Sequence, residues 1–232
     1  MTISIEPIGI VHSPFEEKFG VPRQPGLVEV ISSIELLPPF NLPDAVKGLD
    51  GFSHIWVIFQ FHQAVREQWK PLVRPPRLGG NEKRGVFATR SPFRPNNIGL
   101  SVVELKSIEM TDGKILLKVN GLDVIDNTPI LDIKPYIGYA DSISDAHSGF
   151  AVSAPQKAMQ VIFSEQAEQQ LLSLGEENLK SLIESALSYD VRPAYRQTEQ
   201  SAEYGIRLAG RNIRWLVEAD RVVVLSVKST QN

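Results

Sequence analysis

Seven short apolar runs, closely spaced and without a long amphipathic helix between them, constrain the fold of this 232-residue chain most strongly. Each run is rich in Val, Ile and Phe and is bounded by Gly, Pro, Asp or Asn, which is typical of β-strands. The runs are 3–11, 27–31, 52–61, 84–89, 101–108, 115–122 and 130–136. A Thr-Asp-Gly sequence at 111–113 predicts a hairpin between two of them. Strands at this spacing favour a barrel or a sandwich over a parallel α/β sheet.

The last third of the chain has a different pattern. A polar stretch of small residues at 144–156 predicts a linker, and a strand at 161–163 follows it. Ser164 is placed to cap a helix that runs to Leu174, and a second helix is expected at 177–189. Further strands are expected at 204–208, 212–218 and 221–228. We therefore expect a mainly β N-terminal barrel over 1–150 and a smaller α+β domain over 151–232.

Several classes of protein are disfavoured by what the sequence lacks. It has no cysteine, which excludes disulfides and thiolate metal sites. It has no apolar run of about 18 residues and no signal-peptide pattern at its start, so we expect a cytoplasmic protein without a membrane partner. Walker A, G-x-G-x-x-G and H-E-x-x-H motifs are missing, and the four histidines lack metal-ligand spacing, so no metal is expected.

Positive charge is concentrated in the middle of an acidic chain. The whole sequence has a net charge of −3, but the stretch 66–94 has eight basic and two acidic residues, a difference of +6. A patch of this kind steers polyanions to one face of a protein, although composition alone also allows an ordinary solvated surface. The basic residues are Arg66, Lys70, Arg74, Arg77, Lys83, Arg84, Arg90 and Arg94.

Two further features predict a functional site. The segment 85–101 carries Arg90 and Arg94 in a loop that prolines and glycines restrict to few conformations. Guanidinium groups presented in this way suit carboxylate or phosphate recognition. In the apolar run 130–136, strand alternation places Asp132, Lys134 and Tyr136 on one face and Leu131 and Ile133 on the other. A solvated strand face with an ion pair is the simpler explanation of that triplet by itself.

Taken together, the motifs resemble those of the bacterial tRNA N6-threonylcarbamoyladenosine methyltransferase family. The resemblance covers essentially the whole chain and is carried by the segments 21–26, 50–56, 74–81, 85–96, 131–136 and 192–195. It implies a β-barrel methyltransferase, not of the Rossmann type, that uses S-adenosylmethionine and works as a homodimer. The implied substrate is the threonylcarbamoyl-modified adenosine beside the anticodon of tRNA, methylated on N6.

The resemblance also implies which residues surround the cofactor. These are Pro25, Gly26, Leu27, His62, Gln63, Arg90, Leu100, Asn120, Gly121, Leu122 and Asp123. Two positions depart from the usual family pattern. Asn97 replaces a proline, which is expected to loosen its loop slightly. Asn127 replaces a glycine, and asparagine is expected to keep that turn because it tolerates left-handed backbone angles.

The chemistry of the implied reaction suggests roles for the remaining candidates. The target nitrogen is a poor nucleophile until it loses its proton or its neighbouring carbonyl is polarised. The catalytic candidates are Asp132 as base or orienting group, Lys134 as carbonyl polariser, and Tyr136 on the same face. Arg94 is expected to bind the threonyl carboxylate. The residues expected to bind tRNA phosphates are Arg74, Arg77, Lys83, Arg84, Arg192 and Arg196.

Two other hypotheses remain open at this point. The same cofactor pocket would serve an enzyme acting on a small molecule, but the basic stretch and the second domain exceed what such a substrate needs. A non-catalytic RNA-binding module would use the arginine-rich loops equally well, but it would have no use for the cofactor segments.

Overall fold

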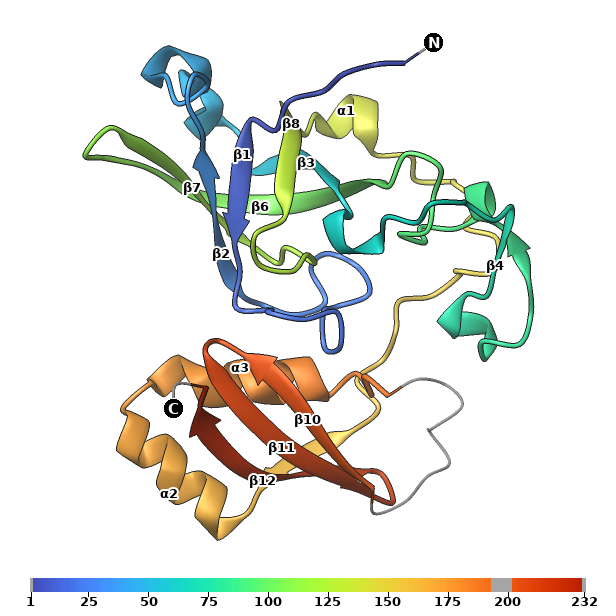
Figure 1. Ribbon diagram of the computed structural model, residues 1–232, viewed down its shortest axis with the longest axis vertical. Helices are drawn as coiled ribbons and strands as arrows, with labels where there is room; N and C mark the ends of the chain where they lie inside the picture. Colours follow the sequence, from blue (N-terminus) through green and yellow to red (C-terminus); the bar gives the residue numbers. More distant parts are fainter. Residues whose placement is uncertain (1, 193–201, 231–232) are drawn as a thin grey trace. The chain divides into compact units, whose positions relative to one another are not determined.

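The computed structural model describes residues 2–192 and 202–230, and the chain forms two compact units (Figure 1). The first unit comprises Met1–Ser13 and Arg23–Ser148, and the second comprises Pro14–Pro22 and Gly149–Asn232. The second unit thus includes a segment from near the start of the sequence. Among the described residues no helix is both long and apolar enough to span a bilayer.

The first unit is a closed barrel in which six strands have the order β1-β2-β7-β6-β3-β8. Every neighbouring pair is antiparallel. The strands are β1 (Gly9–His12), β2 (Ile31–Leu36), β3 (His54–Gln60), β6 (Ile98–Thr111), β7 (Lys114–Asn120) and β8 (Pro129–Pro135). The predicted hairpin at 111–113 joins β6 to β7. The expected mainly β barrel is confirmed.

Three predicted strands differ from those observed. Only the last residues of the run 3–11 belong to a strand, β1, because Ile3 and Ile5 are exposed and pair with no neighbouring strand. The second strand begins at Ile31, where the predicted run ends, since Ser32 occupies an inward position that apolar patterning does not mark. The run 84–89 forms two strand residues and then a 3₁₀ turn.

Apolar side chains fill the barrel. Val11, Ile34, Val57, Leu117 and other inward residues of all six strands form one buried cluster. Because the interior is packed, a ligand site must lie on the loops or the outer wall rather than inside.

A long connection between β3 and β6 carries short elements of its own. These are a 3₁₀ turn at His62–Ala64, β4 (Leu72–Val73), a 3₁₀ turn at Pro76–Leu78, β5 (Arg84–Gly85) and a 3₁₀ turn at Val86–Ala88. Strands β4 and β5 pair antiparallel and make a separate small hairpin. Elsewhere in this unit, Pro43–Val46 and Leu49–Gly51 form two 3₁₀ turns between β2 and β3, and α1 (Gly138–Asp141) comes after β8.

In the residues that the structure describes, the second unit is a four-stranded sheet with two helices. The sheet has the order β10-β11-β12-β9, and its strands are β9 (Gln160–Phe163), β10 (Glu203–Leu208), β11 (Arg211–Glu218) and β12 (Arg221–Ser229). The helices are α2 (Glu165–Leu174) and α3 (Glu177–Leu187). The predicted cap of α2 is confirmed, because Ala167 N donates to Ser164 Oγ at 3.2 Å. The expected smaller α+β region is confirmed.

The segment 14–22 is part of the packing of the second unit. Phe15 is only 1% exposed and forms an isolated bridge with Leu208. The amide of Ala209 donates to Pro14 O at 2.8 Å, and the amide of Gly210 donates to Glu16 Oε1 at 2.6 Å. A piece of chain between two barrel strands thereby completes the other unit.

Candidate functional site

Two glycine turns, 95 positions apart in the sequence, meet at one end of the barrel. Gly26 N donates to Gly121 O at 2.8 Å, and Gly121 N donates to Val30 O at 3.0 Å. Gly121 has φ +79°, and a Cβ placed on it would lie 3.0 Å from the Gly26 Cα. Any larger residue at position 121 would therefore push the two turns apart. The structure thus brings together two segments that the resemblance assigned to a cofactor.

A charged cluster lies beside these turns. Arg90 Nη1 donates to Gln24 Oε1 at 2.7 Å, next to Pro25 and Gly26. Ser101 Oγ donates to Asp123 Oδ1 at 2.6 Å. Burial raises the pKa of the Asp123 carboxyl from 3.8 to about 6, against the opposing effects of the Ser101 hydrogen bond and the Arg90 charge. Because burial disfavours the ionised form of this carboxyl, a cation bound next to it would stabilise that form.

The other cofactor candidates occupy varied surroundings. Leu122 lies within the buried barrel cluster, so only its backbone is available to a ligand. The Asn120 amide donates to Glu104 Oε2 at 3.2 Å. Pro25 and Leu27 are half-buried in the turn around Gly26, and His62 and Gln63 form the 3₁₀ turn directly after β3.

The catalytic candidates lie on the outer wall of the barrel, as strand alternation predicted. Lys134 Nζ lies 2.7 Å from Asp132 Oδ2, and the Tyr136 ring lies 5.9 Å from that of Trp56. Asp132 pairs with Ile58, which in turn pairs with Leu100. Neighbouring strands are about 4.8 Å apart, so Asp132 and the cofactor candidate Leu100 lie in one row across the wall, roughly 10 Å apart.

The strand β8 is irregular next to Asp132. A bulge in the pairing of β3 with β8 leaves Leu131 between the residues that pair with Phe59 and Ile58. Ile130, rather than Leu131, is therefore the fully buried neighbour of Asp132.

The expectation that Asn97 loosens the arginine loop, residues 85–101, is wrong. Asn97 is buried, and its amide nitrogen donates to Pro92 O at 2.8 Å and to Ala64 O at 3.3 Å. Its own carbonyl accepts from Phe61 N at 2.7 Å. Asn97 thus ties the loop to the end of β3. Asn127 has φ +60°, so the expected left-handed turn at that position is confirmed.

Arg94 has a structural contact in the same loop. Its Nη1 donates to Thr89 O at 2.7 Å, and the side chain is half-buried. The guanidinium therefore helps to hold the loop, and its remaining N–H groups are what a substrate would meet.

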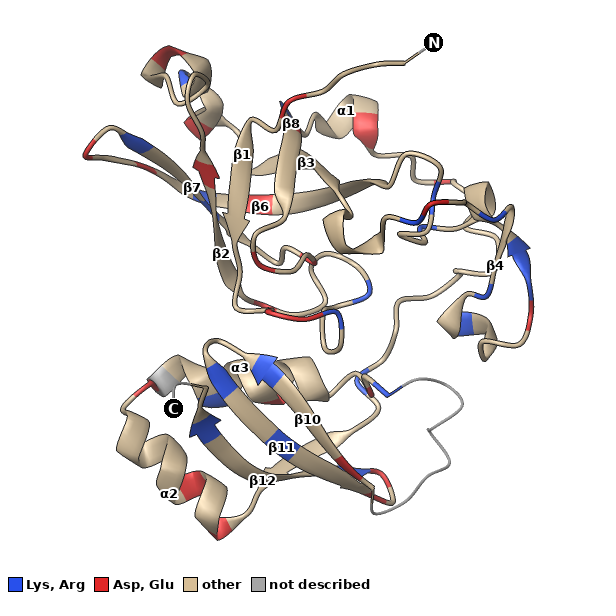
Figure 2. Cartoon of the chain, in the orientation of Figure 1, with Lys and Arg blue, Asp and Glu red and all other residues tan. Residues whose placement is uncertain are grey.

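The residues expected to bind tRNA phosphates divide into two groups. Arg74, Arg77 and Lys83 are exposed on the β4–β5 hairpin, and Arg84 pairs there with Glu82. In Figure 2 the chain around β4 carries several stretches coloured as Lys or Arg. Arg192 is a correction, because its side chain is 4% exposed and makes a bidentate pair with Asp190. A guanidinium held in this way does not reach a phosphate. Arg196 lies outside the described residues.

Sequence patterning missed two members of the cluster. Gln24 and Ser101 lie in segments that the sequence marks, 21–26 and 85–101, but neither was predicted as a site residue, although both make direct hydrogen bonds to predicted site residues. A serine at an inward strand position was the available signal for Ser101. In the described part of the chain, no group of three or more His, Asp or Glu side chains is arranged to hold a metal ion.

The architecture places this protein among those built on a closed antiparallel β-barrel. A closed antiparallel barrel with its candidate site on loops and outer wall, followed by an α+β unit, differs from the parallel-sheet nucleotide-binding folds. The family model for the tRNA-methyltransferase O N-terminal domain matches residues 10–142, and that for the TrmO C-terminal domain matches residues 156–230. The chain belongs to the TrmO family.

Individual relatives agree with this assignment. A tRNA (adenine(37)-N6)-methyltransferase from Escherichia coli K12 is 48% identical over 93% of this chain and 94% of its own. A Pseudomonas aeruginosa protein, provisionally named an S-adenosylmethionine-dependent methyltransferase, is 47% identical over 93% of each chain. The crystal structure of TrmO from Pseudomonas aeruginosa superimposes with a TM-score of 0.81 at 40% identity and covers 99% of both chains.

Proposed function

We propose that this protein transfers a methyl group from S-adenosylmethionine to N6 of adenine 37 in tRNA, and that this adenine carries a threonylcarbamoyl group. The observation that carries the proposal is the match of both TrmO domain models to one chain, with 48% identity to a tRNA (adenine(37)-N6)-methyltransferase. The reaction belongs in the cytoplasm, where its two substrates are found.

The cluster around Asp123 fits the proposed cofactor. Gly26 is exposed and, apart from its chain neighbours, no atom lies within 4 Å of the place that its Cβ would take, so its backbone is open to a ligand. The largely buried Asp123 carboxylate suits a cationic ligand. Arg90 and the turn 25–27 would flank the ligand on one side, with 120–123 on the other and His62, Gln63 and Leu100 completing the site. When bound, S-adenosylmethionine supplies an electrophilic methyl group.

The outer-wall triplet is the proposed catalytic group. Asp132 would accept or orient the N6 proton, and Lys134 would polarise the neighbouring carbonyl oxygen. Their 2.7 Å ion pair means that the lysine exchanges one oxygen partner for another when substrate binds. Tyr136 supplies a polar aromatic edge on the same face.

Recognition of the tRNA is assigned to the arginine loop and the hairpin. Arg94 would meet the threonyl carboxylate, and Arg74, Arg77, Lys83 and Arg84 would bind phosphates. We further propose a homodimer as the working form, which sedimentation equilibrium would show as a mass of twice 25.8 kDa.

The test is methyl transfer from labelled S-adenosylmethionine to two tRNA pools, one carrying threonylcarbamoyladenosine and one an unmodified transcript. We expect label in the modified pool alone. Label in both pools would remove the threonylcarbamoyl requirement. No label in either pool, with cofactor binding intact, would overturn the proposed activity.

A matched pair of variants tests the catalytic group. Lys134 on β8 and Lys106 on β6 each pair with an acid two residues earlier on the same barrel strand, at 2.7 and 2.8 Å. Lys134→Met is expected to lower kcat by about 100-fold, within the usual range for general acid–base groups. Lys106→Met is expected to leave kcat unchanged. Equal effects of the two substitutions would show that only surface charge matters.

A further inference from the structure

Two large aromatic side chains are exposed on the β4–β5 hairpin. Trp69 is 50% exposed and Phe87 is 75% exposed, and their ring centroids lie 6.5 Å apart with planes inclined by 34°. Indole and phenyl rings normally bury most of their surface in a protein of this size. A side-by-side pair left in solvent is therefore a marker of a binding surface.

The hairpin itself holds the two rings together. Leu72 pairs with Gly85 and Val73 with Arg84, and Val86 N donates to Pro71 O at 2.9 Å. This register places Trp69 and Phe87 just beyond the paired residues, where the segment before β4 runs beside the segment after β5. The aromatic surface is thus fixed by backbone pairing and does not depend on the contact between the rings.

The surroundings of the pair are basic. The segment 69–87 contains five Lys or Arg residues, namely Lys70, Arg74, Arg77, Lys83 and Arg84, against the single acid Glu82. Figure 2 shows several stretches coloured as Lys or Arg along the chain around β4. A partner that meets both rings and this charge must be flat, aromatic and anionic. An unpaired nucleotide has these properties, because it combines a base with a phosphate.

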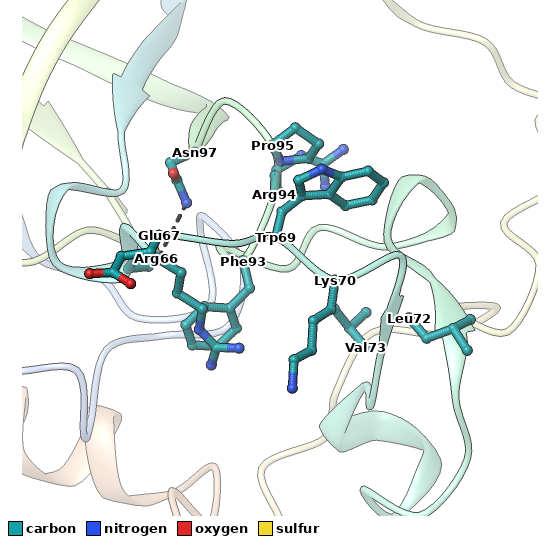
Figure 3. Close-up of a pocket in the computed structure, with 11 residues that line it drawn as sticks. Arg66, Glu67, Trp69, Lys70, Leu72, Val73, Phe93, Arg94, Pro95 and Asn97 are labelled. Atoms are coloured by element: carbon teal, nitrogen blue, oxygen red, sulfur yellow. Dashed lines mark hydrogen bonds between the residues drawn. The ribbon is translucent and has the colours of Figure 1, made fainter.

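A small cavity adjoins the aromatic pair. It has a volume of about 100 Å³, and Trp69, Lys70, Arg94 and Pro95 are among the residues that line it (Figure 3). The Arg66 guanidinium lies 3.6 Å from the centroid of the Phe93 ring, which lines the same cavity. The aromatic surface therefore continues toward Arg94, the residue proposed to meet the threonyl carboxylate.

We propose that Trp69 and Phe87 form a stacking platform for an unpaired nucleobase of the anticodon loop, next to the adenine that is methylated. The platform rests on the proposed function, since tRNA is the RNA that this site would meet. Its contribution is sequence-tolerant, because every base presents a π-face. The neighbouring cations hold the phosphates on either side of the stacked base.

The experiment measures the Kd of a fluorescent anticodon stem-loop RNA at several salt concentrations. Trp69→Ala and Phe87→Ala are each expected to weaken binding by about tenfold, within the range for loss of one base-stacking contact. Trp69→Phe should retain most of the affinity, whereas Trp69→Leu should not. Since no charge is removed, the slope of log Kd against log salt should stay unchanged, in contrast to Lys70→Ala.

The matched control is Tyr139→Ala on α1, which removes an aromatic side chain that is 93% exposed away from the hairpin. It should leave Kd unchanged. Abasic substitutions in the RNA locate the stacked base, because the loss at that position should not add to the loss from Trp69→Ala. Thermal unfolding and S-adenosylmethionine binding of each variant confirm an intact fold.

Several outcomes would overturn the platform. Unchanged Kd in the Trp69→Ala/Phe87→Ala double variant, with wild-type methyl transfer intact, refutes the stacking proposal alone. Absence of methyl transfer by the wild-type protein refutes the proposed function instead. A change in sedimentation mass in the double variant, without an effect on RNA affinity per subunit, would assign the aromatic pair to contact with a second copy of the chain.

Discussion

At the scale of single residues, Asp123 is the most informative group in the candidate site. Burial raises its pKa from 3.8 to about 6, so the folded protein binds this proton more tightly than the unfolded chain does. Unfolding then releases protons between these two pH values, and the free energy of unfolding falls as pH rises across that window. Above about pH 6 the loss is complete.

Asp123→Asn is therefore expected to change the pH dependence of stability. The variant lacks the titrating group and so does not lose this stability as pH rises. The unfolding free energy of the variant minus that of the wild type should therefore increase by on the order of 2 kcal/mol from pH 4 to pH 7. Thermal or urea unfolding of the ligand-free protein across this range provides the measurement. Asp126→Asn, which removes another carboxyl three residues further along the same segment, is the comparison. Parallel pH profiles for wild type and Asp123→Asn would contradict the raised pKa.

At the scale of elements, the loop that carries both arginines is held by Asn97. Its φ of +49° lies in the left-handed region, where asparagine is tolerated and proline is impossible. Its amide also satisfies two carbonyls, Ala64 O and Pro92 O. The loop here is thus fixed by hydrogen bonds at the position where the resemblance led us to expect a proline.

Asn97→Ala is expected to destabilise the protein by about 1–3 kcal/mol, since two carbonyls lose their donor and alanine disfavours the left-handed angle. Asn97→Gly should lower the free energy of unfolding less than Asn97→Ala, because glycine adopts the left-handed backbone conformation, although it too lacks the side-chain hydrogen bonds. Asn96→Ala, at an exposed neighbouring position, should have little effect. Urea unfolding gives the free energies, and hydrogen exchange at the Phe61 amide, which bonds to Asn97 O, reports on the loop itself. A larger effect at Asn96 than at Asn97 would contradict this role.

The same elements show what the sequence could predict and what it could not. Strands with alternating buried apolar residues, such as those at 54–60 and 114–120, follow from patterning because one face meets the packed interior. The strand at 31–36 was displaced in the prediction, because its inward positions include Ser32. The contacts of Asp123 with Ser101, and of Arg90 with Gln24, depend on which loops meet in space, and spacing along the chain does not contain that information.

At the scale of the whole molecule, the division of the chain is not a single cut. The second unit contains Pro14–Pro22 as well as everything from Gly149. The segment is short, with three charged residues between two phenylalanines and a proline at each end, and neither its charge nor its spacing distinguishes it from a barrel loop. Within the second unit, the Phe19 ring stacks on Trp215 at 6.3 Å, and Phe15 is buried beside Leu208. The stability of the C-terminal sheet therefore depends on residues more than 130 positions earlier.

Phe15→Ala is expected to destabilise the second unit by about 3–5 kcal/mol, the usual cost of removing a fully buried phenylalanine side chain. Because Phe15 belongs to that unit, amides of β10, β11 and β12 should lose hydrogen-exchange protection, while those of β3, β6 and β7 in the barrel keep theirs. Ile5→Ala removes an exposed apolar side chain from the same part of the sequence and should change neither set. Equal loss of protection in both sheets would mean that the two units unfold as one cooperative body. If neither sheet loses hydrogen-exchange protection, Phe15 contributes nothing to the packing of the C-terminal sheet.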